Sequence, residues 1–286
     1  MHTPSERHRV PLVSVIMPVF NAADVLPSAL ESLLAQSLDD WELIACDDGS
    51  TDGSWAILQG WERERPGRVR ALRNAENRGT AYSANRCLHL ATGEFIARQD
   101  ADDVSDPERF HAQVNFLRAH DECDWVSCSV TVMRYDGQVL GVRRMKPRPT
   151  RTDLYRGNPF AHGAAMIRTA AVRAVGGYRV QWSARRCEDY DLWMRLVAAG
   201  YKGGNLCQPY YRFREGAQAY GRKTLATRLG EVVIRLKGYR ALGAPPWAYA
   251  YAFQPLIAAA IPKSILRRKH EAQLVRTDPP VRETQP

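Results

Sequence analysis

Three carboxylates fall within four consecutive positions of the sequence, at Asp100, Asp102 and Asp103. They closely follow residues 94–98, whose apolar character is typical of a strand, so we expect them in a turn at that strand's end. Carboxylates this close repel one another unless a cation or protons intervene. Mg²⁺ and Mn²⁺ are commonly held by one or two carboxylates, with substrate phosphate oxygens and waters as further ligands. The motif therefore fits a divalent cation site, and it fits equally a solvated acidic turn before the next helix.

Two further acidic pairs suit either binding or catalysis. Asp47 and Asp48 follow a predicted strand over 41–46, where a carboxylate can accept the imide N–H of a nucleobase. The letters DDGSTD are also a good helix start. Glu188 and Asp189 open another predicted helix, and a general base can come from such a distant segment because it must lie opposite the leaving group. Negative charge at a helix start is also an ordinary cap.

Apolar periodicity predicts the elements that position these residues. Short apolar runs alternate with helical patterns through the first hundred residues, which predicts a parallel sheet with helices on both faces. The expected strands are 13–17, 41–46, 69–72 and 94–98, and the expected helices are 26–34, 55–58 and 80–91. In such sheets the carboxyl ends of the strands gather polar loops into one crevice, where ligands bind.

The second half of the chain continues with less regular patterns. A helix over 107–119, a strand over 124–133, a hairpin turn at 136–137, a short strand over 165–167 and a helix over 188–200 are expected. No glycine-rich fingerprint follows the first strand, where the sequence reads PVFNAAD. This argues against a nicotinamide or flavin site.

The charges are divided unevenly along the 286 residues. The first 133 residues hold 12 Lys and Arg against 21 Asp and Glu, whereas the other 153 hold 28 against 10. An acidic half can bind a cation, and a basic half can face phosphates or a membrane surface. The six cysteines form no CxxC pair, no apolar signal core opens the sequence, and the apolar stretch 247–261 is shorter than the ~20 residues of a spanning helix. We therefore expect reduced thiols and a cytoplasmic protein.

Seven motifs together resemble one known family. In order they read VSVIMPVFN, DDGSTDGS, NRGTAYSAN, ARQDADDVSDPERF, NPFAHGAAMIR, VGGY and CEDYDLWMRL, over roughly residues 11–215. A single DxD is weak evidence, but the ordered set is specific. The chain resembles the inverting family 2 glycosyltransferases, whose GT-A fold is a Rossmann-like, mixed and mostly parallel sheet flanked by helices.

The resemblance implies a role for each matching residue on the donor side. The nucleotide of a nucleotide sugar, with UDP expected, would be bound by one group of residues. These are Pro18, Asp47 and Asp48 at the base, Asn77, Arg78 and Gly79 near the base and ribose, and Asp100 at the ribose or in indirect contact. Asp102 is the implied direct ligand of a divalent cation, Mn²⁺ or Mg²⁺.

The resemblance also implies the chemistry on the acceptor side. Asp189 is the implied base that removes a proton from the acceptor hydroxyl during attack on the anomeric carbon. Attack from the opposite face inverts that centre. Glu188 would shape the acceptor site, and Trp182, in the loop GYRVQWSARRC, could contact the acceptor sugar or simply lie exposed.

Two features remain open. Family members often carry Tyr-Arg-x-His after the last strand, whereas this chain reads YRFR at 211–214, so Arg212 or Arg214 could pair with phosphate oxygens instead. His162 is a second candidate near the site. A hydrogen-bonded structural histidine is the reading we favour for it.

The implied organisation is one catalytic domain with an appendage. The expected parts are a disordered start (1–10), a catalytic domain (11–219) with nucleotide-binding (11–103) and acceptor-binding (104–219) halves, a helical appendage (220–275) and a disordered tail (276–286). Residues 245–270 combine aromatic and apolar residues with a basic cluster. They would either lie in the cytoplasmic surface of the inner membrane or pack on the catalytic domain.

The predicted function is sugar transfer from a nucleotide sugar to a saccharide or lipid-linked acceptor of a cell-surface polysaccharide. One alternative is a non-catalytic nucleotide- or sugar-binding module of the same fold, which the presence of Asp102 and Asp189 disfavours. Another is a sugar nucleotidyltransferase, which would need a Gly- and Arg-rich phosphate loop after the first strand. Nucleic-acid binding is the weakest alternative, because the basic residues are scattered and no recognition motif is present.

Overall fold

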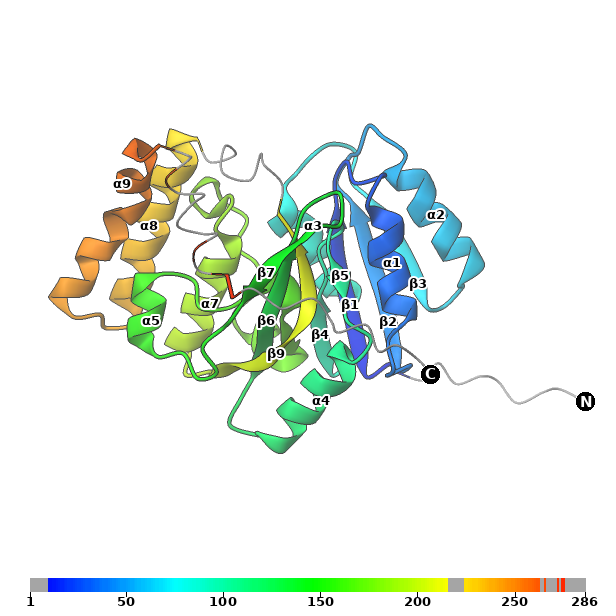
Figure 1. Cartoon of the computed structure of the whole chain (residues 1–286), viewed down its shortest axis with the longest axis horizontal. Helices are drawn as coiled ribbons and strands as arrows, with labels where there is room; N and C mark the ends of the chain where they lie inside the picture. The colour runs from blue at the N-terminus through cyan, green and yellow to red at the C-terminus, as the bar shows by residue number, and fades with distance from the viewer. Residues whose placement is uncertain (1–9, 216–223, 263–264, 266–271, 273, 276–286) are drawn as a thin grey trace, which may run out of the picture.

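The computed structural model describes residues 10–215, 224–262, 265, 272, 274 and 275. Within these residues a nine-stranded sheet forms the centre of the molecule, with helices on both faces (Figure 1). The strand order is β3-β2-β1-β4-β8-β6-β9-β5, and β7 pairs with β6 outside this path. The disorder expected for 1–10 and 276–286 falls outside the described residues, apart from Val10.

The first half of the sheet is parallel, as the sequence predicted. Its strands are β1 (Val13–Val19), β2 (Trp41–Asp47), β3 (Val69–Arg73) and β4 (Phe95–Arg98), joined by α1 (Leu26–Leu34), α2 (Ser54–Glu64) and α3 (Thr80–Leu90). The strands read as continuous apolar runs because helices cover both faces. In the register of β1 and β2, Pro18 lies opposite Cys46 and Val19 opposite Asp47, so the loops that follow both strands start side by side.

The second half makes the sheet mixed. It contains β5 (Val104–Ser105), α4 (Arg109–Ala119), β6 (Trp125–Met133), β7 (Val139–Arg143), α5 (Arg151–Arg156), β8 (Met166–Arg168), α6 (Thr169–Ala174), α7 (Glu188–Ala198) and β9 (Gly203–Arg214). Strand β8 is antiparallel to β4 and β6, whereas β9 is parallel to β6. The antiparallel pairing of β6 with β7 confirms the predicted hairpin at 136–137. The residues of the YRFR motif lie inside β9, not after it.

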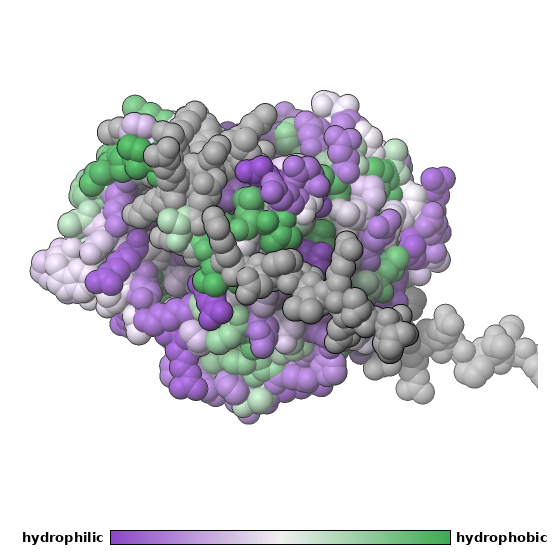
Figure 2. All heavy atoms as spheres, viewed as in Figure 1, coloured by the Kyte–Doolittle hydropathy of each residue, from purple (hydrophilic) through white to green (hydrophobic). Residues whose placement is uncertain are grey.

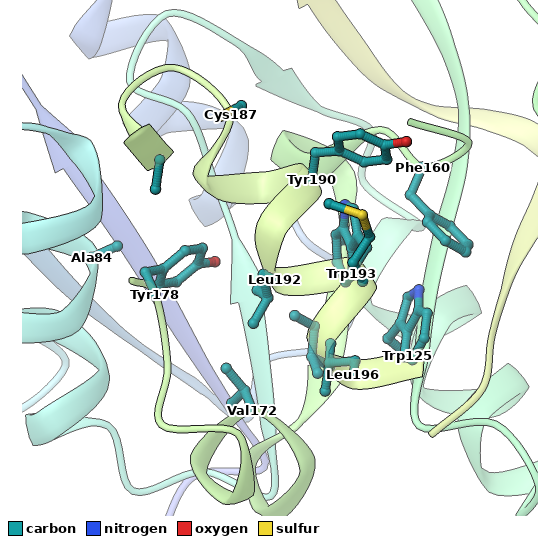
Figure 3. Close-up of a cluster of buried hydrophobic side chains, with 14 of the residues drawn as sticks. Ala84, Trp125, Phe160, Val172, Tyr178, Cys187, Tyr190, Leu192, Trp193 and Leu196 are labelled. Carbon is teal, nitrogen blue, oxygen red and sulfur yellow. The ribbon is translucent and has the colours of Figure 1, made fainter. Parts of the chain in front are cut away.

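Apolar residues fill both faces of the sheet. One cluster lies under α1 and α2 and includes Leu30 and Leu33. The other lies under α3 and α7, where the Trp193 ring stacks on Trp125 with centroids 5.4 Å apart (Figure 3). Trp193 and Leu196 are fully buried. This second cluster holds α7 firmly against the sheet.

Helices also form the described part of the C-terminal region. They are α8 (Leu225–Ala241), a 3₁₀ segment η4 (Pro246–Phe253) and α9 (Gln254–Ala260). Tyr239, Ala248 and Ala252 are buried in the same apolar cluster as Trp193, and the Tyr239 hydroxyl donates to the backbone oxygen of Tyr155, 2.5 Å away. These helices therefore pack on the domain that carries α5 and α7. No helix of the described chain combines the length and apolar character needed to cross a bilayer.

Candidate active site

Asp48 joins the loop after β2 to the loop before α3. Its Oδ1 accepts from Asn74 Nδ2 at 2.6 Å and from the Arg78 backbone N–H at 2.9 Å, and its Oδ2 accepts from the Gly79 backbone N–H at 2.8 Å. A buried carboxylate needs such donors, because burial without partners would disfavour its charge. The structure thus brings Asp48 together with residues 77–79, which the sequence placed in one nucleotide site.

Asp47 is fully buried and supports the same turn from inside. Its Oδ2 accepts from the Ser50 backbone N–H and lies 3.2 Å from Arg73 Nε. Its Oδ1 has no hydrogen-bond partner among the described residues. Pro18, on the neighbouring strand, is partly exposed. Of the two adjacent acids, only Asp48 therefore reaches the 77–79 loop.

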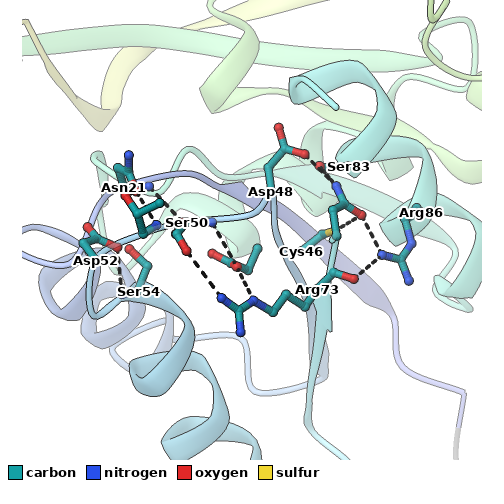
Figure 4. A network of polar contacts seen from close by, with 12 residues as sticks. Asn21, Cys46, Asp48, Ser50, Asp52, Ser54, Arg73, Ser83 and Arg86 are labelled. Atoms are coloured by element: carbon teal, nitrogen blue, oxygen red, sulfur yellow. Dashed lines mark hydrogen bonds and ion pairs between the residues drawn. The ribbon is translucent and has the colours of Figure 1, made fainter. Parts of the chain in front are cut away.

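A polar network ties the loop after β1 to the loop after β2 (Figure 4). The Asn21 backbone N–H donates to Ser50 Oγ at 3.0 Å, and Asn21 Oδ1 accepts from the Thr51 backbone N–H at 2.9 Å. The Asp52 carboxylate accepts from the backbone N–H groups of Ala23 and Ser54. The DDGSTD letters therefore lead into α2, as one reading predicted, but the N-cap position is Gly53, which makes no side-chain hydrogen bond. The hydrogen bonds of Ser50 and Asp52 hold this turn beside Asp48.

The acidic turn after β4 has one buried and two accessible carboxylates. Asp103 is fully buried, and its Oδ1 accepts from the Arg214 backbone N–H at 2.7 Å. Burial, followed by the charges of Asp102 and Asp100, raises the pKa of Asp103 well above its usual range. Asp102 and Asp100 are partly exposed, and Asp102 Oδ2 accepts from the Tyr135 hydroxyl at 3.1 Å. Asp102 and Asp100 are thus the carboxylates that a ligand can reach.

Two arginines hold the acidic turn in place from behind. Arg109 is fully buried and donates to Gln99 Oε1, to Ser105 Oγ and to a backbone oxygen of β4, the last at 2.6 Å. Arg214 Nε donates to the backbone oxygen of Asp102 at 2.7 Å. The sequence suggested Arg214 as a phosphate ligand, but its guanidinium supports the turn. The role of Arg109 was not predicted, although it lies within the ERF letters of a quoted motif.

Gly163 leaves room for the Asp100 carboxylate. A Cβ at this position would lie 2.7 Å from Asp100 Oδ2 and 2.8 Å from the Tyr211 hydroxyl oxygen. The same hydroxyl accepts from the Asp100 backbone N–H at 3.1 Å. Any side chain at position 163 must therefore displace the Asp100 carboxylate or the Tyr211 hydroxyl.

We expect Gly163→Ala to reduce the rate of sugar transfer by at least about tenfold, because misplacing a reacting group slows the reaction. Overpacking should also lower the free energy of unfolding by roughly 1–3 kcal/mol. Steady-state rates and thermal unfolding would measure both effects. Gly60→Ala is the matched control, since nothing lies within 4 Å of a Cβ there and alanine favours the helix. Full activity in Gly163→Ala would contradict the proposed tight fit.

The start of α7 carries the second acidic pair. Asp189 Oδ2 accepts from Asn158 Nδ2 at 2.7 Å. Two residues later, Asp191 is buried and pairs with Arg179 at 2.8 Å and Arg195 at 2.7 Å. Asp191 therefore fixes the helix and the preceding loop, whereas Asp189 is only partly buried.

His162, Arg98 and Tyr178 lie between the acidic turn and α7. His162 Nε2 lies 2.9 Å from the Tyr178 hydroxyl, and the charges of Asp100 and Asp189 both act on the His162 ring. Burial, followed by the charge of Arg98, lowers the pKa of His162 to about 4, so the ring is neutral at neutral pH. The ring also packs on Trp193 of α7, with centroids 5.9 Å apart, and the next residue, Gly163, lies against the Asp100 carboxylate. These contacts fit a hydrogen-bonded structural histidine.

Arg98 is the buried cation of this cluster. Its Nη2 donates to Asp100 Oδ1 at 2.6 Å, while its Nε and Nη1 are buried and have no hydrogen-bond partner in the described part of the chain. Burial of Asp100 opposes its ionisation, but Arg98, followed by the other neighbouring charges, lowers the pKa of Asp100. Asp100 is thereby kept ionised at the edge of the site. Nothing in the sequence indicated this role except the ARQD letters of a quoted motif.

Trp182 lies in the loop before α7 and is exposed over 66% of its surface. It opens a 3₁₀ turn, η2 (Trp182–Ala184), whose Ser183 backbone packs closely against Gly230 of α8. Arg186 follows with φ at 64°, a conformation rare for a non-glycine residue. The loop is thus anchored on α8 while the Trp182 ring remains available for contact.

The carboxylates fit an ion that is shared with a substrate. Among the described residues, no three His, Cys, Asp or Glu side chains are grouped so as to hold a metal by themselves. The partly exposed carboxylate of Asp102 lies beside Asp103, whose Oδ2 has no hydrogen-bond partner within the described part of the chain. This matches the sparse protein donor set typical of Mg²⁺ and Mn²⁺ beside phosphates. Asp102 would hold such an ion, with nucleotide phosphates as the other ligands.

Comparisons with known proteins indicate the family of the chain. The family model described as glycosyl transferase family 2 matches residues 14–176. EpsE of Bacillus subtilis (strain 168), named as a glycosyltransferase, is 37% identical over 93% of this chain and 95% of its own length. WfaP of Escherichia coli, named as a UDP-Glc:alpha-D-GlcNAc-diphosphoundecaprenol beta-1,3-glucosyltransferase, is 28% identical over 72% of this chain and 79% of its own.

A solved structure shows the same arrangement of the chain. The crystal structure of S. aureus TarS 1-349 in complex with UDP-GlcNAc has a TM-score of 0.65 and 19% sequence identity to this chain. The similarity covers 85% of this chain and 72% of the TarS chain. Because the sequence identity is only 19%, this similarity shows a shared fold and nothing further.

Proposed function

The chain belongs to glycosyl transferase family 2, and on that premise we propose that it inverts the anomeric centre of a sugar while transferring it from a UDP-sugar to a saccharide or lipid-linked acceptor in cell-surface polysaccharide synthesis. The observation that supports this proposal is the position of residues 162 and 163: Gly163 lies against the Asp100 carboxylate, and the His162 ring packs on Trp193 of α7, the helix that begins with Glu188 and Asp189. This supports one site in which a proposed nucleotide side faces a proposed base side. A lipid-linked acceptor would bring the enzyme to the cytoplasmic face of the inner membrane.

Asp48 would accept a hydrogen bond from the nucleobase. A carboxylate offers about four acceptor positions, and three of those on Asp48 are occupied by Asn74 and by the backbone N–H groups of Arg78 and Gly79. One position remains on Oδ2, which suits a single imide N–H of uracil. The three existing hydrogen bonds would hold the oxygen in place before the nucleotide arrives.

Asp100 and Asp102 would bind the ribose and phosphate end of the donor. When bound, a divalent ion supplies positive charge that stabilises the departing nucleoside diphosphate. The chain's contribution is to hold the Asp102 carboxylate still. Arg214 does this through the Asp102 backbone oxygen, and Tyr135 does it through the side chain.

Asp189 would remove the proton from the acceptor hydroxyl. A positioned base of this kind must reach the attacking oxygen from the side opposite the leaving group. Asn158 orients the Asp189 carboxylate through Oδ2, which leaves Oδ1 for the acceptor hydroxyl. Glu188 would shape the acceptor side of the site, and the exposed Trp182 ring would stack on the acceptor sugar.

The pH dependence of transfer should report on Glu188. Burial, followed by the charge of Asp189, raises the pKa of Glu188 to about 7, and Arg98 and Asp100 act on it more weakly. Above this pKa the charge of Glu188 would strengthen Asp189 as a base. We expect kcat/KM to rise about tenfold between pH 6 and 8, following the ionised fraction of one group, and this limb to disappear in Glu188→Gln.

Stability provides a second readout of the same group. Because folding raises the pKa of Glu188, its stabilising contribution is complete below its unfolded pKa and is lost as the pH rises through about 7. The melting temperature of Glu188→Gln should therefore exceed that of the parent at pH 8 and approach it at pH 5. A pH profile of transfer that is identical in parent and variant would refute the assignment.

A panel of nucleotide sugars tests the proposed function directly. We expect one UDP-sugar to be hydrolysed or transferred in the presence of Mn²⁺ or Mg²⁺ and to raise the melting temperature more with the cation than without it. No turnover and no stabilisation with any nucleotide sugar would contradict the proposal. Stabilisation without turnover, in the presence of acceptor extracts, would favour a non-catalytic binding module.

A further inference from the structure

The C-terminal helices expose large apolar side chains in two pairs. Leu225 and Leu229 on α8 are exposed over 64% and 45% of their surfaces, and Phe253 and Ile257 at α9 over 48% and 62%. Within each pair the residues are four positions apart, so they lie on one side of their helix. We call these four residues the C-terminal apolar face.

The two pairs lie at one end of the molecule. Arg228, between the two leucines, donates through Nη1 to the backbone oxygen of Pro255 at 2.7 Å, so the start of α8 lies against α9. Figure 2 shows hydrophobic side chains gathered at the end of the molecule where Figure 1 places α9. The four residues therefore present neighbouring apolar surface to the solvent.

This face is separate from the surfaces that these helices bury. The inner side of α8 carries Ile234 and Tyr239, which are almost wholly buried, and η4 buries Ala248 and Ala252. Part of the 245–270 segment therefore packs on the domain, as one of the two sequence readings expected. The apolar residues left exposed lie on the outer side, and packing within the domain does not account for them.

The described helices around this face carry more positive than negative side chains. Residues 224–262 contain four Lys and Arg, at 228, 235, 237 and 240, and a single acidic residue, Glu231. Glu231 is buried and pairs with Arg235 at 3.0 Å, so it contributes no exposed negative charge. Each Lys or Arg near an anionic bilayer adds roughly 1 kcal/mol of attraction. Apolar side chains within a basic region are what a helix needs to lie in the surface of an anionic membrane.

We propose that the C-terminal apolar face inserts into the surface of an anionic lipid bilayer, with α8 and α9 lying at the interface. The choice of a bilayer over another polyanionic surface rests on the proposed lipid-linked acceptor and on Trp247, which is half exposed on η4 and of a type enriched at membrane interfaces. The acceptor would then be delivered from the same surface on which the enzyme rests.

Vesicle flotation of the full chain tests this proposal. The parent should float with vesicles of phosphatidylcholine and phosphatidylglycerol and much less with phosphatidylcholine alone. The double variant Leu225→Glu/Ile257→Glu should partition at least about tenfold more weakly, because it replaces two inserted apolar groups with charges. The control Leu34→Glu/Val139→Glu changes residues with 42% and 50% exposure elsewhere and should bind like the parent.

Two further measurements separate the possible failures. Donor hydrolysis without vesicles should be the same in the parent and in both double variants. Absence of donor hydrolysis in all three proteins would overturn the proposed function but would not affect the flotation result. Equal flotation of the Leu225→Glu/Ile257→Glu variant and the parent, or no flotation of either, would overturn the membrane assignment. Light scattering would show whether the parent is a dimer. If it is, and if the Leu225→Glu/Ile257→Glu variant is a monomer, the C-terminal apolar face would be assigned to a second copy of the chain instead.

Discussion

Asp189→Asn should reduce sugar transfer by about 10²- to 10⁴-fold, because it removes a positioned general base. The fall should appear in kcat, with the affinity for the nucleotide unchanged, since the proposed mechanism assigns Asp189 to the acceptor side of the site. The variant should fold normally, because an asparagine carbonyl can still accept from Asn158 Nδ2 at the same place. Single-turnover rates and UDP titration would separate the two effects.

Asp191→Asn provides the matched control on the same helix. Asp191 is buried between Arg179 and Arg195, so losing its charge leaves two cations poorly compensated and should lower the melting temperature. At temperatures where this variant is folded, its transfer rate should stay much closer to that of the parent. If Asp191→Asn were slower than Asp189→Asn at equal folded fraction, the assignment of the base would be wrong.

Asp102→Asn should cost about 10²- to 10³-fold in transfer, equivalent to the several kcal/mol that a positioned cation supplies. The amide is a poorer ligand for a hard cation, so stabilisation by UDP should lose its dependence on Mn²⁺. The acidic turn should keep its shape, because Arg214 holds the backbone oxygen of residue 102 and not its side chain. Thermal shifts with UDP, with and without Mn²⁺, would measure this.

Asp121→Asn is the control for this change. Its carboxylate is 96% exposed, and its nearest ion pair is at 3.7 Å, so no effect on Mn²⁺ dependence is expected. Unaltered Mn²⁺ dependence in Asp102→Asn would move the metal ligand to another residue of the turn. Asp100→Asn would then be the variant to measure.

The nucleotide-binding half of the fold could be predicted because its signals are strong and local. Strands covered on both faces must be apolar throughout, so β1, β2 and β4 stand out in the sequence. Strand β5 has two residues and α5 has six, which is too few for any periodicity to show. Strand β9 contains Gly203, Gly204 and Pro209, residues that usually interrupt strands, so its twelve-residue length could not be expected.

The acidic residues of the proposed site could be singled out because carboxylates cluster directly after β2 and β4 and at the start of α7. Their supports could not, because each depends on groups that come from distant parts of the chain. Arg109 bonds backbone and amide oxygens of β4 and its turn, and Gly163 matters only through its distance to Asp100. Asp191 had one readable signal, the four-residue spacing to Arg195, but nothing in the sequence indicated Arg179.

The setting of Arg109 has a consequence for the enzyme between turnovers. Every group that accepts a hydrogen bond from its guanidinium is a neutral oxygen, on Gln99, Ser105, Gln113 or the backbone. No carboxylate among these partners offsets its positive charge, which therefore acts on the aspartates of the acidic turn. A permanent internal counter-ion of this kind would limit repulsion between the aspartates after the products leave. The acidic turn would then already have its binding conformation when the next donor arrives.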